Sequence, residues 1–291
     1  MSRIAYVNGA FLPLAQAGVG VEDRGFLFAD AVYEVWAVRG GRLSDEAGHF
    51  GRLWRSLREL EITAPMSEAS LRAIIRELLR RNRIADGLVY LQVSRGEAPR
   101  DFPFPGPEVR PTVFLMAKRL DLAAQERRAR QGVVVSAQPD IRWGRCDIKS
   151  VALLPNVLAK QAARRAGGFE ALLIDRDGLV TEGASSTAWI VDAEGRLLTR
   201  DLEGNILPGV TRAAVLQIAA ERQLRIEERA FSLEEAKAAR EMFLTSASVG
   251  AMPVIAIDAH PIAEGLPGPV SLALREAYLA ANDASSRRGK L

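Results

Sequence analysis

The sequence is poor in the residues that form disulfides and bind metals. Among 291 residues there is one cysteine, Cys146, and only two histidines, His49 and His260. One cysteine excludes an internal disulfide, and two isolated imidazoles do not supply the ligand cluster of a zinc site. We therefore expect no metal and a reducing, cytoplasmic compartment. We expect His49 to be bonded locally within a helix.

Long apolar runs are also missing. No stretch is long enough to cross a bilayer. The segment Met1 to Leu14 alternates apolar and polar residues around Asn8-Gly9. This pattern predicts a β-hairpin and differs from the continuous apolar core of a signal peptide. We expect no membrane association.

Neither sign of charge dominates. The 39 basic residues are balanced by 36 acidic ones and are spread along the chain, for a formal net charge of +3. Without a concentrated basic patch, nucleic acid is not an expected partner. A chain of this length that is 48% hydrophobic has enough apolar mass for two cores. Because the composition changes after Lys118, we predict a small α+β domain over residues 1–120 and a larger domain over 121–291.

Hydrophobic periodicity predicts a mixed first domain. Apolar residues recur at helical spacing over 45–60 and again after Ser67, which is a good N-cap. Both helices are expected to cover a sheet. The predicted strands are 32–39, 88–94 and 112–117, and a proline-rich irregular loop covers 99–111.

The second domain is richer in short strands bounded by turns. No βαβ rhythm is evident, so mainly antiparallel strands are expected. Ser232 and Glu235 form a capping box at the start of a short helix. The predicted strands are 133–137, 171–175, 179–182, 187–191 and 196–199, and two further helices are predicted over 155–166 and 210–223.

Lysine is scarce in this arginine-rich chain, which has only five lysines. Four of them lie in polar or terminal contexts, whereas Lys149 is followed by an apolar stretch, Val151 to Leu154. Burial among apolar neighbours favours the neutral, nucleophilic amine. A surface lysine at a strand end is the ordinary alternative, and two further features favour chemistry.

The first feature is Glu182, which ends an apolar strand and precedes a run of small hydroxyl residues. A carboxylate facing a pyridine nitrogen keeps that nitrogen protonated, which is the electronic requirement of pyridoxal chemistry. The second feature is Ile206 to Arg212, where Gly209 opens directly into a helix. The amides and dipole of a helix N-terminus form a phosphate site. Taken singly, the first feature is also typical of a hairpin turn, and the second is more commonly an ordinary helix start.

Taken together and in this order, these segments resemble the fold-type IV aminotransferases. The resemblance covers essentially the whole chain, and its most specific part runs from Asp147-Ile148-Lys149-Ser150 through Leu158-Ala159-Lys160, joined to Glu182-Gly183 and to 207–212. It implies a two-domain α+β architecture with a small N-terminal α/β domain and a larger C-terminal pseudo-barrel domain. It also implies pyridoxal 5′-phosphate as cofactor and a homodimer with its sites near the subunit and domain boundary.

The resemblance also implies roles for individual residues. Lys149 would form the Schiff base and move the substrate's proton, and Glu182 would pair with the pyridine nitrogen. The expected phosphate and ring contacts are Arg52, the amides of Val210 and Thr211, Leu207 against the ring, and Ser248.

Within the family the sequence is most similar to the D-amino acid transaminases. The similarity lies in Tyr90 to Gly96 and in the segment that contains Arg100. In that group a tyrosine, an arginine and a histidine receive the substrate carboxylate, so Tyr33 and Arg100 take this role by resemblance, and Phe102 stands where the histidine is expected. The implied reaction is ping-pong transamination between a D-amino acid such as D-alanine and a 2-oxo acid, 2-oxoglutarate or pyruvate.

Three alternatives stay open at this point. A branched-chain L-amino acid aminotransferase would use the same cofactor residues with a different carboxylate site. An aminodeoxychorismate lyase would keep Lys149 and eliminate pyruvate. A non-catalytic binding protein would keep the fold alone, which the presence of Lys149, Glu182 and Arg52 disfavours.

Overall fold

The computed structural model describes residues 3–203 and 205–288, and the chain divides into two compact units. The first unit comprises Met1–Leu120 together with Ile148–Ala152, and the second comprises Asp121–Asp147 and Leu153–Leu291. The division expected from the sequence placed Ile148–Ala152 in the second domain. This short segment, which contains Lys149, instead belongs to the first unit, whereas the residues that precede and follow it in the sequence belong to the second.

The first unit is built on a six-stranded antiparallel sheet with the order β2-β1-β6-β5-β3-β4. Asn8 and Gly9 have positive φ angles of 43° and 101°, as a two-residue hairpin turn requires, so β1 and β2 pair as predicted. The bounds are β1 Ile4–Val7, β2 Ala10–Pro13, β3 Ala31–Arg39, β4 Arg42–Leu43, β5 Gly87–Ser94 and β6 Thr112–Arg119.

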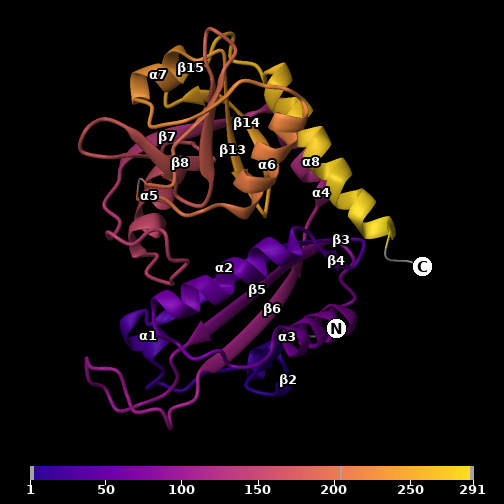
Figure 1. The fold of residues 1–291 in the computed structure, drawn as a ribbon, viewed down its shortest axis with the longest axis vertical. Coiled ribbons are helices and arrows are strands. Elements are labelled where there is room, and N and C mark those ends of the chain that lie inside the picture. The colour runs from indigo at the N-terminus through magenta and orange to yellow at the C-terminus, as the bar shows by residue number, and fades with distance from the viewer. Residues whose placement is uncertain (1–2, 204, 289–291) are drawn as a thin grey trace. The chain divides into compact units, whose positions relative to one another are not determined.

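Two amphipathic helices pack on this sheet, as expected (Figure 1). Helix α2 (Glu46–Glu59) packs on β3, and α3 (Glu68–Asn82) packs on β1 and β6. The predicted cap is present, because the Ser67 hydroxyl accepts a hydrogen bond of 3.2 Å from the Ser70 N–H. The core between helices and sheet includes Trp36, Phe50, Leu53, Leu71, Ile75, Leu78 and Leu91. The short helix α1 (Arg24–Phe28) and the 3₁₀ turn Leu14–Gln16 precede β3.

The second unit contains a nine-stranded sheet with the path β12-β11-β10-β13-β14-β7-β8-β9, to which β15 adds beside β14. The last strand of the path, β9, returns next to β10, to which a short turn over 184–186 joins it, so the sheet curls back on itself. This is the half-barrel that the resemblance implied. The bounds are β7 Val133–Pro139, β8 Glu170–Ile174, β9 Val180–Gly183, β10 Thr187–Val191, β11 Leu197–Thr199, β12 Ile226–Glu228, β13 Glu241–Ser246, β14 Gly250–Ile257 and β15 His260–Pro261.

Most strand pairs of this unit are antiparallel, as expected, but the expected absence of a βαβ unit is wrong, because β7, helix α5 (Leu154–Arg165) and β8 form one. Strands β7 and β8 are parallel neighbours, and α5 packs on both of them. Two other strand pairs, β7 with β14 and β11 with β12, are also parallel. A long irregular connection over 140–153 separates β7 from α5, and it hides the βαβ pattern in the sequence. Lys149 lies in this connection.

The remaining helices pack around the curled sheet (Figure 1). Helix α4 (Leu122–Gln131) packs on β14, so it belongs to the second unit. Helices α6 (Val210–Glu221) and α8 (Pro269–Arg288) pack on β13 and on each other, and the predicted capping box begins α7 (Leu233–Ala238). In the described part of the chain, no helix has the length and apolar character to span a membrane.

Candidate active site

Lys149 is fixed by its backbone against the beginning of β3. The Tyr33 N–H donates to the Lys149 carbonyl at 2.9 Å, and the Val151 N–H donates to the Ala31 carbonyl at 3.0 Å. The Lys149 N–H donates to the Ser56 hydroxyl on α2 at 3.2 Å. Both polar groups of the Lys149 main chain are therefore satisfied locally, and the side chain is not needed to hold the segment in place.

The Lys149 amine lies over an aromatic ring. Its Nζ is 4.2 Å from the centroid of the Tyr33 ring, which stacks on Tyr90 at 5.6 Å. Burial raises the pKa of the Tyr90 phenol, and the nearby Tyr33 adds to this effect, so the phenol stays protonated and donates to Gln92 Oε1 at 2.8 Å. The structure thus brings together two of the expected site residues, Lys149 and Tyr33.

Arg52 takes part in a buried ion pair. Its Nε lies 2.7 Å from Glu34 Oε1, and its Nη2 lies 2.9 Å from Glu34 Oε2. His49 Nδ1 lies 2.8 Å from Glu34 Oε2, which is shorter than its 3.3 Å contact to Arg52 within the helix. His49 does have the expected contact within its own helix, to Arg52, but its shorter contact is to Glu34 on β3. Tyr33 and Glu34 are adjacent on β3, so the pleat directs their side chains to opposite faces of the sheet.

Arg100 and Phe102 lie on an exposed loop whose backbone is held by hydrogen bonds from Arg24. Phe102 is 76% exposed, and the Arg100 guanidinium lies 5.8 Å from its ring centroid. Buried Arg24 donates to the Asp101 carbonyl at 2.7 Å and to the Phe102 carbonyl at 3.2 Å, while its Nε pairs with Asp30. The backbone of this loop is thereby anchored although its side chains face solvent in the single chain.

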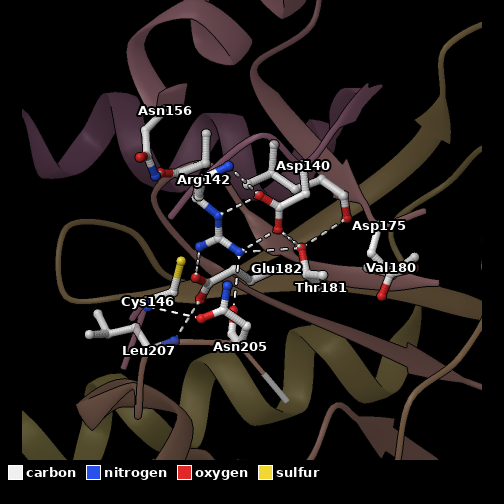
Figure 2. A network of polar contacts seen from close by, with 12 residues as sticks. Asp140, Arg142, Cys146, Asn156, Asp175, Val180, Thr181, Glu182, Asn205 and Leu207 are labelled. Atoms are coloured by element: carbon white, nitrogen blue, oxygen red, sulfur yellow. Dashed lines mark hydrogen bonds and ion pairs between the residues drawn. The ribbon is translucent and has the colours of Figure 1, made fainter. Parts of the chain in front are cut away.

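In the second unit, Glu182 is held in a polar network near the end of β9 (Figure 2). It is 6% exposed, and its Oε1 accepts a hydrogen bond from Arg142 Nη1. The Leu207 N–H donates to Glu182 Oε2 at 3.4 Å, which joins two of the predicted residues. Arg142 also pairs with Asp140, the residue that follows β7.

The ionisation of this network follows from its partners. Burial alone raises the pKa of the Asp140 carboxyl, but the hydrogen bonds and charge of Arg142 outweigh burial and leave that pKa below its ordinary value. Burial disfavours the charged Arg142 guanidinium, yet its two carboxylate partners raise its pKa overall. Burial raises the pKa of the nearby Cys146 thiol to about 11, so this thiol is protonated near neutral pH.

The start of α6 has the features of an anion site. Gly209 is the N-cap residue and provides no side-chain cap, so the first-turn amides of Val210 and Thr211 are left for another acceptor. The buried Thr211 hydroxyl has no hydrogen-bond partner among the described residues. Gly209 is required by space, because a Cβ there would lie 2.9 Å from Thr187 Oγ1 and 3.1 Å from Arg212 Cβ.

Ser248 lies in the turn between β13 and β14. Its hydroxyl is 3.1 Å from that of Ser246, and its carbonyl accepts a hydrogen bond of 2.6 Å from Gln125. The described residues contain no group of three or more histidine, cysteine, aspartate or glutamate side chains arranged to hold a metal ion.

Three residues that support the predicted site residues were not predicted from the sequence. Arg142 and Asp140 support Glu182, and Glu34 supports Arg52. The spacing Asp140-x-Arg142 directly after a strand was the available signal for the first group. Glu34 carried a weaker signal, as a charged residue in the interior of a strand whose other charged residue, Arg39, lies at its end.

The chain belongs to the family described as amino-transferase class IV, whose model matches residues 31–257. The two-unit fold with its curled second sheet agrees with this membership.

Its similarity to individual members is extensive. It is 40% identical to a D-alanine aminotransferase of Bacillus licheniformis over 264 residues, which covers 91% of this chain and 92% of that protein. It is 37% identical to the D-alanine aminotransferase of Staphylococcus haemolyticus, with 94% and 95% covered. Among solved structures, a branched-chain amino acid aminotransferase with pyridoxamine 5′-phosphate superposes with a TM-score of 0.86 at 26% identity, covering 97% of this chain and 94% of that one. The Escherichia coli branched-chain enzyme, at 22% identity, has a TM-score of 0.88 over 97% of this chain and 95% of its own, and it supports the fold alone.

Proposed function

We propose that this protein is a pyridoxal 5′-phosphate-dependent aminotransferase that moves the amino group of a D-amino acid, such as D-alanine, to 2-oxoglutarate or pyruvate. The observation that carries the proposal is the 36–40% identity to D-alanine aminotransferases over more than nine-tenths of the chain. Similarity to the solved branched-chain enzyme with pyridoxamine 5′-phosphate is lower, at 26%.

The residues at the start of α6 fit the phosphate of this cofactor. An uncapped helix N-terminus offers backbone N–H donors and the positive end of the helix dipole. The buried Thr211 hydroxyl, which lacks a partner among the described residues, provides a further donor. An anion is the kind of ligand that would satisfy all of these groups at once.

We assign the other cofactor contacts as the resemblance implies. Arg52, already oriented by Glu34, supplies positive charge for the phosphate. Leu207 packs against the ring, Ser248 adds a phosphate contact, and Glu182 accepts the ring N–H. Lys149 Nζ binds the cofactor covalently.

When bound, pyridoxal 5′-phosphate supplies a protonated ring that accepts electrons from the substrate's α-carbon. The remaining steps belong to the protein. Lys149 Nζ would take the proton from the α-carbon and pass it to the cofactor in the first half-reaction, and it would move a proton in the reverse direction, onto the α-carbon of the second substrate, in the second half-reaction. Because the first 2-oxo acid leaves before the second one binds, the kinetics are ping-pong. Arg100 and Tyr33 bind the substrate carboxylate. An arginine fork suits that group, whereas Phe102 contributes apolar surface where a histidine would give a third polar contact.

We also propose a homodimer in the cytoplasm. The first unit leaves several large apolar side chains exposed in the single chain, and such surface is typical of assembly interfaces. These side chains are Val21, Phe26 and Phe104. The lone thiol of Cys146 suits a reducing compartment. Light scattering coupled to size-exclusion chromatography tests the dimer, and a monomer at micromolar concentration would contradict it.

The test of the activity is spectroscopic. We would record the visible absorption of the cofactor-loaded protein before and after adding D-alanine, and in a separate sample L-leucine. Loss of the visible band with D-alanine alone is the expected result. A response to L-leucine alone would transfer the assignment to a branched-chain enzyme, and a band unresponsive to both would favour the lyase. Absence of a band after adding pyridoxal 5′-phosphate would overturn the cofactor assignment itself.

A further inference from the structure

The guanidinium of Arg142 forms a bidentate contact with Asp140 and a further contact with Glu182. Its Nε donates to Asp140 Oδ1 at 2.9 Å and its Nη2 donates to Asp140 Oδ2 at 2.7 Å. This planar fork fixes the orientation of the whole group, and it leaves Nη1 directed at Glu182 Oε1 (Figure 2). Oε1 of Glu182 therefore accepts a hydrogen bond from a donor whose orientation is fixed.

Asp140 is in turn fixed from both sides. It follows directly after β7, and it accepts a hydrogen bond of 2.7 Å from the Thr181 hydroxyl. Because Thr181 precedes Glu182 on β9, the contacts close a ring from Asp140 through Arg142 to Glu182 and back through the strand. Such a ring limits the rotation of the Glu182 side chain.

The charges of the ring are also informative. The side chains of Asp140, Arg142 and Glu182 are 7%, 5% and 8% exposed. Arg142 is the positive charge that lies between the carboxylates of Asp140 and Glu182 and pairs with both of them. If the guanidinium were absent, two buried carboxylates would be close together, and one of them would take up a proton.

We propose that Arg142 is a positioning residue that fixes the Glu182 carboxylate and keeps the proton of the facing ring nitrogen on that nitrogen. The inference rests on the proposed function, since it concerns the same cofactor. Arg142 acts through Glu182 and is not assigned a contact with substrate. A purely stabilising ion pair is the alternative, and a buried pair is weak evidence for stability by itself.

The position of the proton separates these two roles. We would bind pyridoxal 5′-phosphate labelled with ¹⁵N in the ring and record the nitrogen chemical shift in the wild type and in variants. The wild type is expected to show a protonated ring nitrogen. Arg142→Gln is expected to shift the signal toward neutral pyridine, because the more basic Glu182 takes the proton.

The opposite charge change gives the decisive contrast. Asp140→Asn removes a negative charge from the same ring, so the ring nitrogen should remain protonated. A merely structural role would make the two variants behave alike, because both break the Asp140–Arg142 pair. Arg196→Gln is the matched control: Arg196 forms a partly exposed ion pair with Asp192 elsewhere in the unit, so this substitution should leave the shift unchanged.

Arg142→Lys keeps the charge but lacks the planar fork. It should retain the proton on the ring nitrogen while cofactor affinity falls about tenfold. If Arg142→Gln does not fold, a neutral ring nitrogen in Arg142→Lys or in Asp140→Asn would still overturn the inference. An unchanged protonated signal in a folded Arg142→Gln would also overturn it, with the proposed function intact. A wild type that binds no cofactor would instead contradict the proposed function.

Discussion

Arg52 on α2 and Glu34 on β3 form a two-pronged ion pair, with Nε 2.7 Å from Oε1 and Nη2 2.9 Å from Oε2. Glu34 is fully buried, and His49 adds a third contact to it at 2.8 Å. Burial alone would raise the pKa of Glu34, but Arg52 and His49 outweigh burial and lower it from 4.5 to about 2. The pair therefore orients the arginine that we assign to the phosphate and links helix to sheet.

Glu34→Gln should lower the stability of the protein in a pH-dependent way. The folded pKa lies below the unfolded value, so the stabilisation is complete above about pH 4.5 and is lost as the pH falls toward 2. Near neutral pH we expect the variant to lose on the order of 3 kcal/mol in free energy of unfolding, because Arg52 is left with a neutral partner. Urea titrations from pH 7 down to pH 3 measure this difference, which should shrink in acid. Parallel stability curves for the two proteins would contradict the assignment.

The sequence predicted the elements whose patterns are local. Asn8-Gly9 gave the first hairpin, and Ser67 gave the start of α3, because turn and cap chemistry is determined within a few residues. The βαβ unit was missed, since pairing of β7 with β8 depends on contacts across the long connection that holds Lys149. Local pattern carries no information about such a partner.

The same distinction applies to the site. Lys149 stood out because lysine is rare in this chain, whereas Arg142 was one arginine among many. Its role depends on Asp140 and Glu182 being brought together from β7 and β9, which only the fold specifies. Glu34 likewise acquires its partners Arg52 and His49 from a separate helix.

Thr211→Val should change stability and cofactor affinity in opposite directions. The buried Thr211 hydroxyl has no partner within the described residues, so its removal should leave the cofactor-free protein as stable or more stable by up to about 1 kcal/mol. The affinity for pyridoxal 5′-phosphate should fall about tenfold, as for the loss of one hydrogen bond to a charged group. Affinity for pyridoxal, which lacks the phosphate, should not change. Calorimetric titration with both compounds measures the contrast.

Thr245→Val is the matched control for that substitution. The Thr245 hydroxyl accepts a hydrogen bond of 2.9 Å from the buried Trp189 Nε1, so its loss should destabilise the protein by about 1–3 kcal/mol. If Thr211→Val loses affinity for pyridoxal and for pyridoxal 5′-phosphate equally, the Thr211 hydroxyl does not contact the phosphate.

Lys149→Ala should abolish covalent attachment of the cofactor without unfolding the protein. The segment is held by backbone contacts to Tyr33 and Ser56, so the free energy of unfolding should change by no more than about 0.5 kcal/mol. Transamination should fall by about a thousandfold or more, since both the anchor and the proton carrier are lost. Mass spectrometry after borohydride reduction should find the adduct in the wild type and in Lys118→Ala, an exposed control, and not in Lys149→Ala. An adduct at another lysine would contradict the assignment of Lys149.

Phe102→His should strengthen binding of the substrate carboxylate. Phe102 is 76% exposed and lies beside Arg100, so the substitution should cost less than about 0.5 kcal/mol of stability. An imidazole there adds a hydrogen-bond donor, and we expect the KM for D-alanine to fall several-fold with a smaller change in kcat. The gain should be larger near pH 6 than near pH 8, because an imidazole with an unperturbed pKa of about 6.5 is charged only at the lower pH. Phe104→His, in the same loop and 56% exposed, is the control and should leave KM unchanged. If both variants leave KM as it is, the carboxylate of the substrate is bound elsewhere, and the apolar Phe102 has no part in selecting it.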